Sequence, residues 1–133
     1  MMPGMDFSAC LETPYVTKDV TAPKTVAEDL KQSQESLDAA SEKLKNPGDP
    51  ADIILLSYRS MYGAAKALVH RAGYQVTNFR YLLTMLDQLY VRAKKLDKNL
   101  LDQLVAAQKL TGNAEEQFKS AQIFLAKVKE IIR

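Results

Sequence analysis

The chain has 133 residues, enough for one domain with its own hydrophobic core but too few for two. Its 18 Lys and Arg and 16 Asp and Glu leave a formal net charge of +2, which excludes binding of nucleic acid through a strongly basic field. The single cysteine, Cys10, excludes an internal disulfide, so we expect a cytoplasmic protein. No apolar run approaches the roughly 20 residues of a membrane span, and the first residues lack the pattern of a secretory signal, so we expect no membrane association.

Residues 1–22 carry Pro3, Gly4 and Pro14 and show no sustained hydrophobic period. This composition predicts a flexible N-terminal arm in front of a folded body of residues 23–133. A few apolar side chains leave open a second interpretation, in which the arm packs on a partner. They are Phe7, Leu11, Tyr15 and Val16.

The first helix is expected from Thr25, which has capping-box spacing to Glu28, to about Asn46. Apolar and small residues recur along it at steps of three and four, which places them on one stripe facing a core. This stripe is Val26, Leu30, Ser33, Leu37, Ala40 and Leu44. Two prolines and a glycine then predict a short turn before Pro50, with Asp49 as the cap of the next, antiparallel helix.

The second helix, roughly residues 51–72, has a wider apolar surface than a single bundle seam requires. One stripe is Ile54, Tyr58, Met61, Ala65 and Leu68, and the stripe beside it is Leu55, Tyr62 and Val69. We expect this helix to be central and the second stripe to be the candidate interface of a homodimer. Small residues such as Ser60 and Gly63 allow a neighbouring helix to approach closely.

A third helix is expected after Gly73, with Thr77 or Asn78 as its cap and apolar residues at helical spacing from Phe79 to Ala93. No strand is expected anywhere in the chain.

The fourth helix is expected over the leucines from Leu96 to Leu110 and ends at Gly112. Asn113 and Glu116 have cap spacing, and a last helix follows to Ile132. The expected fold is therefore all-α: an antiparallel up-and-down bundle of four to five helices.

Motifs for catalysis are scarce. His70 and Cys10 are the only histidine and cysteine, which excludes a zinc site of about four such ligands and makes a Cys–His nucleophile pair improbable. No glycine-rich phosphate loop is present. We expect no metal and no cofactor, and we favour an interaction module over an enzyme.

Basic residues supply candidate contacts to a nucleotide or RNA. On the second helix and after it these are Arg59, Lys66, His70, Arg71 and Arg80. A second candidate patch is Arg92, Lys94, Lys95 and Lys98. Tyrosines at helical spacing could stack on bases, although that spacing favours packing inside the protein. The alternative for the basic residues is simple solvation or stabilisation of a helix C-terminus.

The second helix also carries a family pattern. Ser57, Tyr58, Met61 and Tyr62, the alanines up to Leu68, and then Gly73 resemble the loose signature S-Y-x-x-M-[YF]-x-A-A-x-A-L of HEPN-domain proteins, the higher eukaryotes and prokaryotes nucleotide-binding family. The resemblance extends more generically over residues 25–133. It implies a dimeric helical bundle, and many members are ribonucleases or toxins encoded with a nucleotidyltransferase-type antitoxin.

The catalytic hallmark of the family, Arg followed after four to six residues by His, is absent from this chain. Gly63, Ala64 and Ala65 stand where the arginine before His70 would be. The sequence therefore predicts a divergent, non-catalytic HEPN-like module that dimerises and binds a nucleotidyltransferase-type protein, a nucleotide or RNA, as in a toxin–antitoxin system. Two alternatives stay open: a divergent ribonuclease using Arg59, His70 and Arg71, and a purely structural scaffold.

Overall fold

The computed structural model describes residues 11–46 and 49–132. In chain order, these form β1 (Val16–Lys18), the 3₁₀ helix η1 (Ala22–Thr25), α2 (Val26–Lys45), α3 (Pro50–Arg71), β2 (Tyr74–Val76), α4 (Phe79–Leu86), the π-helical turn η2 (Asp87–Val91), α5 (Lys98–Ala107) and α6 (Ala114–Ile132). The expected all-α helical bundle is confirmed. No helix in the described part of the chain is long and apolar enough to cross a membrane.

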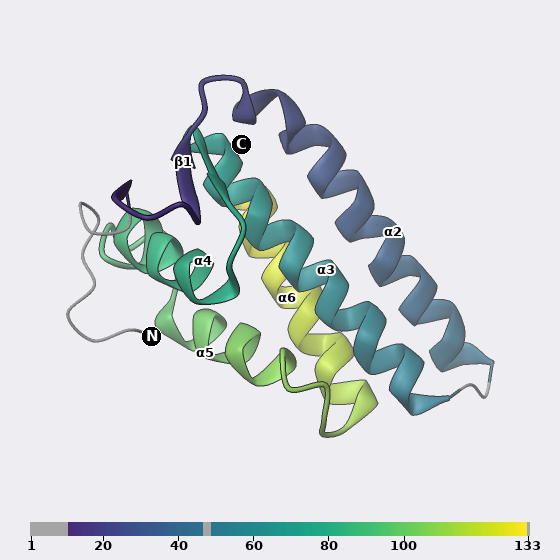
Figure 1. Ribbon diagram of the computed structural model, residues 1–133. Helices are drawn as coiled ribbons and strands as arrows, with labels where there is room; N and C mark the ends of the chain where they lie inside the picture. The colour runs from purple at the N-terminus through teal and green to yellow at the C-terminus, as the bar shows by residue number, and fades with distance from the viewer. Residues whose placement is uncertain (1–10, 47–48, 133) are drawn as a thin grey trace.

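Helices α2, α3 and α6 form the long axis of the molecule, and Figure 1 shows α3 between the other two. Helices α2 and α3 lie side by side and antiparallel, as expected, although Pro47 and Gly48 of the turn between them lie outside the described residues. Helices α4 and α5 pack beside α3 and complete the core. Helix α3 therefore lies at the centre of the fold, in contact with α2, α4, α5, α6, η1 and β2.

Three of the expected helix caps are present. The Asp49 carboxylate accepts from the Ala51 amide at 3.0 Å, the Asn78 side chain from the Arg80 amide at 2.9 Å, and the Asn113 side chain from the Glu116 amide at 3.1 Å. The capping box expected at Thr25 is wrong. Its hydroxyl donates instead to the Ala22 carbonyl at 2.9 Å, because η1 continues directly into α2 and already occupies the helix start.

The third helix is shorter than expected. Helix α4 ends at Leu86 and the chain winds through η2, after which Lys94 adopts a left-handed conformation with φ of 60°. Buried Tyr90 and Leu96 hold this turn, since the Tyr90 carbonyl accepts from both the Lys95 and Leu96 amides. Packing of these two side chains therefore outweighs the continuous helical period of the sequence.

A small sheet contradicts the expectation of no strands. Strands β1 and β2 pair antiparallel, with Val16 opposite Val76 and Lys18 opposite Tyr74. Val16 and Ala22 are buried, so the later part of the expected N-terminal arm packs on the bundle of its own chain. The rest of that arm, including Phe7 and Cys10, lies outside the described residues.

The wide apolar surface of α3 is covered from within the chain. Val69, expected at a dimer interface, is only 1% exposed and belongs to the core. Leu55 and Tyr62 are partly buried. Placing Val69 at the interface is therefore wrong, because α2, α4, α5, α6 and β2 all pack against this helix.

Candidate functional site

A groove lies between α2 and α3, with a volume of about 220 Å³. Helix α2 contributes Gln32, Ser33 and Ser36, and helix α3 contributes Tyr58, Arg59, Tyr62, Gly63 and Lys66. Two of the sequence-predicted contact residues, Arg59 and Lys66, thus share one hollow. We call it the α2–α3 groove.

The floor of the groove exists because the two helices approach closely through small residues. The Ser33 hydroxyl donates to the Ser60 carbonyl at 2.6 Å and lies 3.1 Å from the Ser60 hydroxyl. A Cβ atom on Gly63 would lie 3.5 Å from Ser33 Cβ, an ordinary contact distance. The sequence expectation of close approach at Ser60 and Gly63 is confirmed. Without a side chain at Gly63, the space beside the tyrosines stays open.

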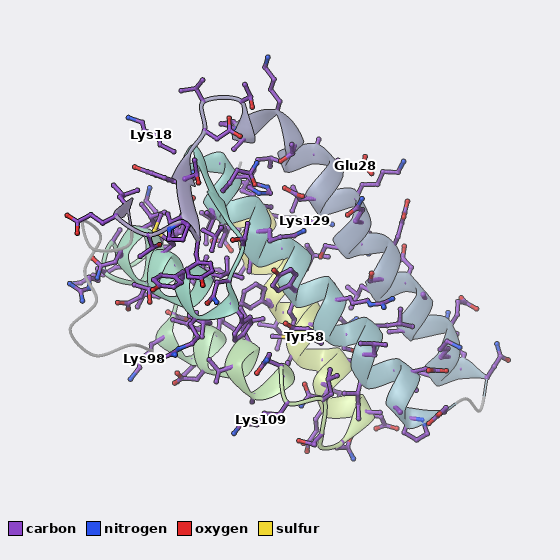
Figure 2. All side chains as sticks on the ribbon, viewed as in Figure 1. Lys18, Glu28, Tyr58, Lys98, Lys109 and Lys129 are labelled. Atoms are coloured by element: carbon purple, nitrogen blue, oxygen red, sulfur yellow. The ribbon has the colours of Figure 1, made fainter. Side chains whose placement is uncertain are left out.

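An aromatic ridge flanks the groove, made of Tyr58, Tyr62 and Phe79. The ring centroids of Tyr58 and Tyr62 are 5.9 Å apart, and those of Tyr62 and Phe79 are 6.5 Å apart. Tyr58 also contacts Phe79, with centroids 6.4 Å apart. Burial raises the pKa of the Tyr58 phenol, and the neighbouring Tyr62 phenol acts in the same direction. The phenol of Tyr58, which is labelled in Figure 2, is therefore uncharged near neutral pH.

The two cations of the groove have no acidic partner. Lys66 Nζ lies 5.3 Å from the centre of the Tyr62 ring, a cation–π contact. Arg59 is exposed, and neither side chain forms an ion pair within residues 11–46 and 49–132. None of the described residues that line the groove is a carboxylate. Their positive charge is therefore available to an anion.

His70 does not face this groove but is locked into a separate polar network. Its Nδ1 donates to the Asp29 carboxylate at 2.6 Å and lies 3.0 Å from the Thr25 hydroxyl. Its Nε2 meets the Gln75 side-chain oxygen at 2.9 Å, and the Gln75 amide group donates to Asp19 at 3.4 Å. Both ring nitrogens thus have a side-chain partner within hydrogen-bond distance, away from the groove.

The network fastens the segment before α2 to the end of α3. The Asp19 backbone amide donates to the Gly73 carbonyl at 2.7 Å. The Thr21 hydroxyl and then its backbone amide hold the pKa of Asp19 below the usual range. His70 and Asp29 are themselves buried, with 10% of each side chain exposed. The position of His70 is therefore explained by structure, as a histidine that satisfies a buried carboxylate.

The remaining basic candidates lie elsewhere. Arg71 is exposed at the end of α3, where it opposes the burial that raises the pKa of the Tyr90 phenol. Arg80 is exposed in the first turn of α4 and does not line the groove. Since residues of a helix rise by about 1.5 Å each, Arg59 and His70 are separated by roughly 16 Å along α3. The trio nominated for ribonuclease chemistry does not converge.

The second basic patch is partly assembled. Lys94 and Lys95 line a hollow of about 250 Å³ together with Lys127, Glu130 and Ile131 of α6. Arg92 is instead paired with Asp87 at 3.3 Å. Lys98 is exposed at the start of α5 and lies outside this hollow. Within the described ranges, no three His, Cys, Asp or Glu side chains gather as metal ligands.

Asp29 and Gln75 are not among the residues predicted from the sequence, and for Tyr58 the helical spacing favours packing over stacking on bases. One signal was available for Asp29: it lies four residues before Ser33, on the buried stripe of its helix, where a carboxylate requires a partner. The partner itself lies 41 residues away in sequence, and no local pattern connects the two.

No protein-family model matches the chain, and no curated protein or solved structure is significantly similar to it. The resemblance to HEPN-domain proteins therefore rests on the residue pattern of α3 and the turn that follows it.

Proposed function

We propose that the chain is a divergent, non-catalytic HEPN-like helical module whose role is to bind a partner. The observation that carries this proposal is the environment of His70. Acid–base cleavage of RNA needs a group that can exchange a proton with the substrate, and histidine is the usual one. The only histidine of the chain has both ring nitrogens occupied and lies away from the groove that collects the free cations.

Binding is supported by the α2–α3 groove. It offers two unpaired cations, a neutral wall of serine and glutamine side chains, and an aromatic ridge. Such a surface can hold an anionic ligand, and no described His, Cys, Asp or Glu side chain lines it. The divergent ribonuclease receives no comparable support, because Arg59, His70 and Arg71 are spread along α3.

The test is incubation of the purified protein with mixed labelled RNAs, with and without divalent metal. We expect no cleavage above the buffer control. Cleavage by the wild-type protein that disappears in Arg59→Ala or Arg71→Ala would overturn the proposal. These two variants are better probes than His70→Ala, since both residues are exposed and their replacement leaves the buried network intact.

From the resemblance we also propose a nucleotidyltransferase-type partner and a homodimer. The partner is tested by co-purification of the chain with the product of a neighbouring nucleotidyltransferase gene. Absence of such a gene and of such a complex would favour the alternative of a purely structural scaffold. For the homodimer, Leu55 and Tyr62 remain partly exposed on α3 and are the proposed contacts with a second copy of the chain.

A further inference from the structure

We propose that residues 15–25 form a pH-sensitive strap over the end of α3, closed while His70 carries a proton on both ring nitrogens and loosened when one of these protons is lost. The strap consists of β1 with Tyr15 before it, the turn after it and η1. It passes the end of α3 on its way to α2, and η1 contacts α3 (Figure 1). This inference goes beyond the proposed function, because it concerns the opening of the fold and not the ligand of the groove.

The hydrogen bonds around His70 are satisfied together in one direction only. At one end, an ionised Asp29 carboxylate offers acceptors alone, so Nδ1 of His70 donates to it at 2.6 Å. At the other end, the Gln75 amide group donates to the Asp19 carboxylate at 3.4 Å, which turns the Gln75 oxygen toward Nε2 of His70 at 2.9 Å. The opposite orientation of Gln75 would set its oxygen against the Asp19 carboxylate. Both ring nitrogens therefore donate, and an imidazole ring that donates from both is positively charged.

Two carboxylates stabilise this positive charge. Asp29 of α2 forms an ion pair with the ring, and only 10% of each side chain is exposed. Asp19 of the strap lies further from the ring. The Thr21 hydroxyl and backbone amide lower the pKa of Asp19 most, and the charge of His70 acts in the same direction. The hydroxyl of Thr25 from η1, 3.0 Å from Nδ1, adds a neutral group at the ring.

Cations of the protein do not compete for these carboxylates. Within the described ranges, 11–46 and 49–132, no lysine or arginine forms an ion pair with Asp19 or Asp29. Arg71, next to His70 on α3, is directed to the Tyr90 phenol: burial raises the pKa of that phenol, and the hydrogen bond from Arg71 opposes the rise. The proton of His70 therefore supplies the positive charge between the two carboxylates.

Few other contacts hold the strap to the body of the protein. Val16 and Ala22 are its buried side chains, whereas Val20 is 83% exposed. The backbone amide of Asp19 donates to the Gly73 carbonyl at 2.7 Å. A segment with few buried apolar side chains opens locally at a lower free energy than the whole fold. The polar link to His70 is therefore a substantial part of what keeps the strap closed.

Loss of the Nε2 proton breaks this link. The ring nitrogen and the Gln75 oxygen then face each other as two acceptors. Rotation of the Gln75 amide group restores a bond to His70 but sets the Gln75 oxygen against Asp19. In either orientation one bond is lost, so the closed strap retains a proton that the open strap releases. Because an exposed histidine loses its proton near about pH 6.5, closure should be tightest below that pH and should weaken as the pH rises above it.

Opening of the strap uncovers apolar surface of the bundle. Val16 is 3% exposed and belongs to the hydrophobic core, and the ring of Tyr15 stacks on Tyr81 with centroids 5.3 Å apart. Strand β2 loses its pairing partner at the same time. None of the strap residues lines the α2–α3 groove, so the change is confined to a different part of the molecule.

The experiment is amide hydrogen exchange, followed by NMR on the isotope-labelled chain between about pH 5.5 and about pH 8.5, with each rate divided by the intrinsic rate at that pH. The reporters are the amides of Asp19 and Thr77, which donate to the carbonyls of Gly73 and Tyr15 across the sheet. We expect their protection to fall by about tenfold from about pH 6 to about pH 8, the usual effect of losing one hydrogen bond to a charged group. The amide of Leu125, a core residue of α6, is the internal reference and should keep its protection.

The ring nitrogens and two variants identify the group responsible. The nitrogen shifts of His70 should show two protonated nitrogens at about pH 6 and one at high pH, with the same midpoint as the loss of protection. His70→Gln, which carries no charge, should show no pH dependence of the strap. Asp19→Asn should also abolish the pH dependence but keep the strap closed, because Gln75 is then free to turn its amide group toward a neutral ring. The matched control is Asp52→Asn, which removes an exposed carboxylate paired with Lys43 at the other end of α3 and should keep the wild-type profile.

Three results would overturn the inference. The first is equal protection of the Asp19 and Thr77 amides at about pH 6 and about pH 8 in the wild-type protein. The second is a His70 ring that carries a single proton at about pH 6, and the third is a pH dependence that persists in Asp19→Asn. This last variant decides the matter even where His70→Gln fails to fold, since Asp19 is partly exposed. The RNA cleavage test of the proposed function is independent of all three.

Discussion

Replacement of His70 by alanine should destabilise the fold. It should leave the lining of the α2–α3 groove unchanged, because His70 is not part of that lining. The ring donates to Asp29 at 2.6 Å and meets the Gln75 oxygen at 2.9 Å. A buried hydrogen bond to a charged group contributes about 1.5–3 kcal/mol and one to a neutral group about 1 kcal/mol. The variant should therefore lose about 3 kcal/mol of unfolding free energy, equivalent to roughly 10 °C in melting temperature for a domain of this size.

Much of this loss comes from the partner that stays behind. Asp29 is 7% exposed, and without His70 its remaining side-chain neighbour among the described residues is the Thr25 hydroxyl at 3.2 Å, which also lies 2.9 Å from the Ala22 carbonyl. A chemical denaturation series on wild type, His70→Ala, Asp29→Ala and the double variant measures the coupling, and we expect the double variant to lose clearly less than the sum of the single ones. Arg71→Ala, next to His70 but exposed, is the control for removing a basic side chain. A loss below about 0.5 kcal/mol in His70→Ala would refute a structural role for the network.

Gly63→Ala should raise the unfolding free energy by up to about 1 kcal/mol in the same assay, since the added Cβ meets Ser33 at 3.5 Å and alanine is the better helix former; a loss would show that the helices are closer than this contact allows. Tyr90→Phe should cost about 1 kcal/mol at neutral pH through the lost 2.5 Å hydrogen bond to the Leu68 carbonyl. Burial raises the pKa of the Tyr90 phenol, so its stabilising effect is present below the ordinary value near 10 and is lost as pH rises above it; the alkaline loss of stability should shrink in Tyr90→Phe, and an unchanged profile would contradict this. Amides bonded in the β1–β2 sheet should exchange more slowly in hydrogen-exchange measurements than exposed ones, and fast exchange there would restore the flexible arm for these residues. Sedimentation at micromolar concentration tests the homodimer, and a monomeric sedimentation coefficient would refute this proposal.

The helices could be read from the sequence because their signals are local. The buried stripe from Leu37 to Ala40 and the caps at Asp49, Asn78 and Asn113 depend on residues within a few positions of each other. The sheet could not be read in this way. Each strand has three residues, and the strands pair across a separation of about 60 residues, so neither carries a period long enough to detect.

The candidate site shows the same division. Arg59, Lys66 and His70 were all selectable as basic residues on one helix, but only the packing of α2 decides which of them stay available. His70 is hydrogen-bonded to the carboxylate of Asp29 from α2. Arg59 and Lys66 have no such partner, because α2 presents serine and glutamine side chains opposite them.

One helix contact accounts for both results. Ser33 and Gly63 bring α2 and α3 close together, and this approach carries Asp29, one turn earlier on α2, to within hydrogen-bond distance of His70. The same approach leaves the groove between the aromatic ridge and the polar side of α2. The pairing of His70 with Asp29 and the cationic groove are therefore consequences of a single packing arrangement. Because this arrangement places the histidine away from the cations, it supports the proposed binding role over proton-transfer chemistry.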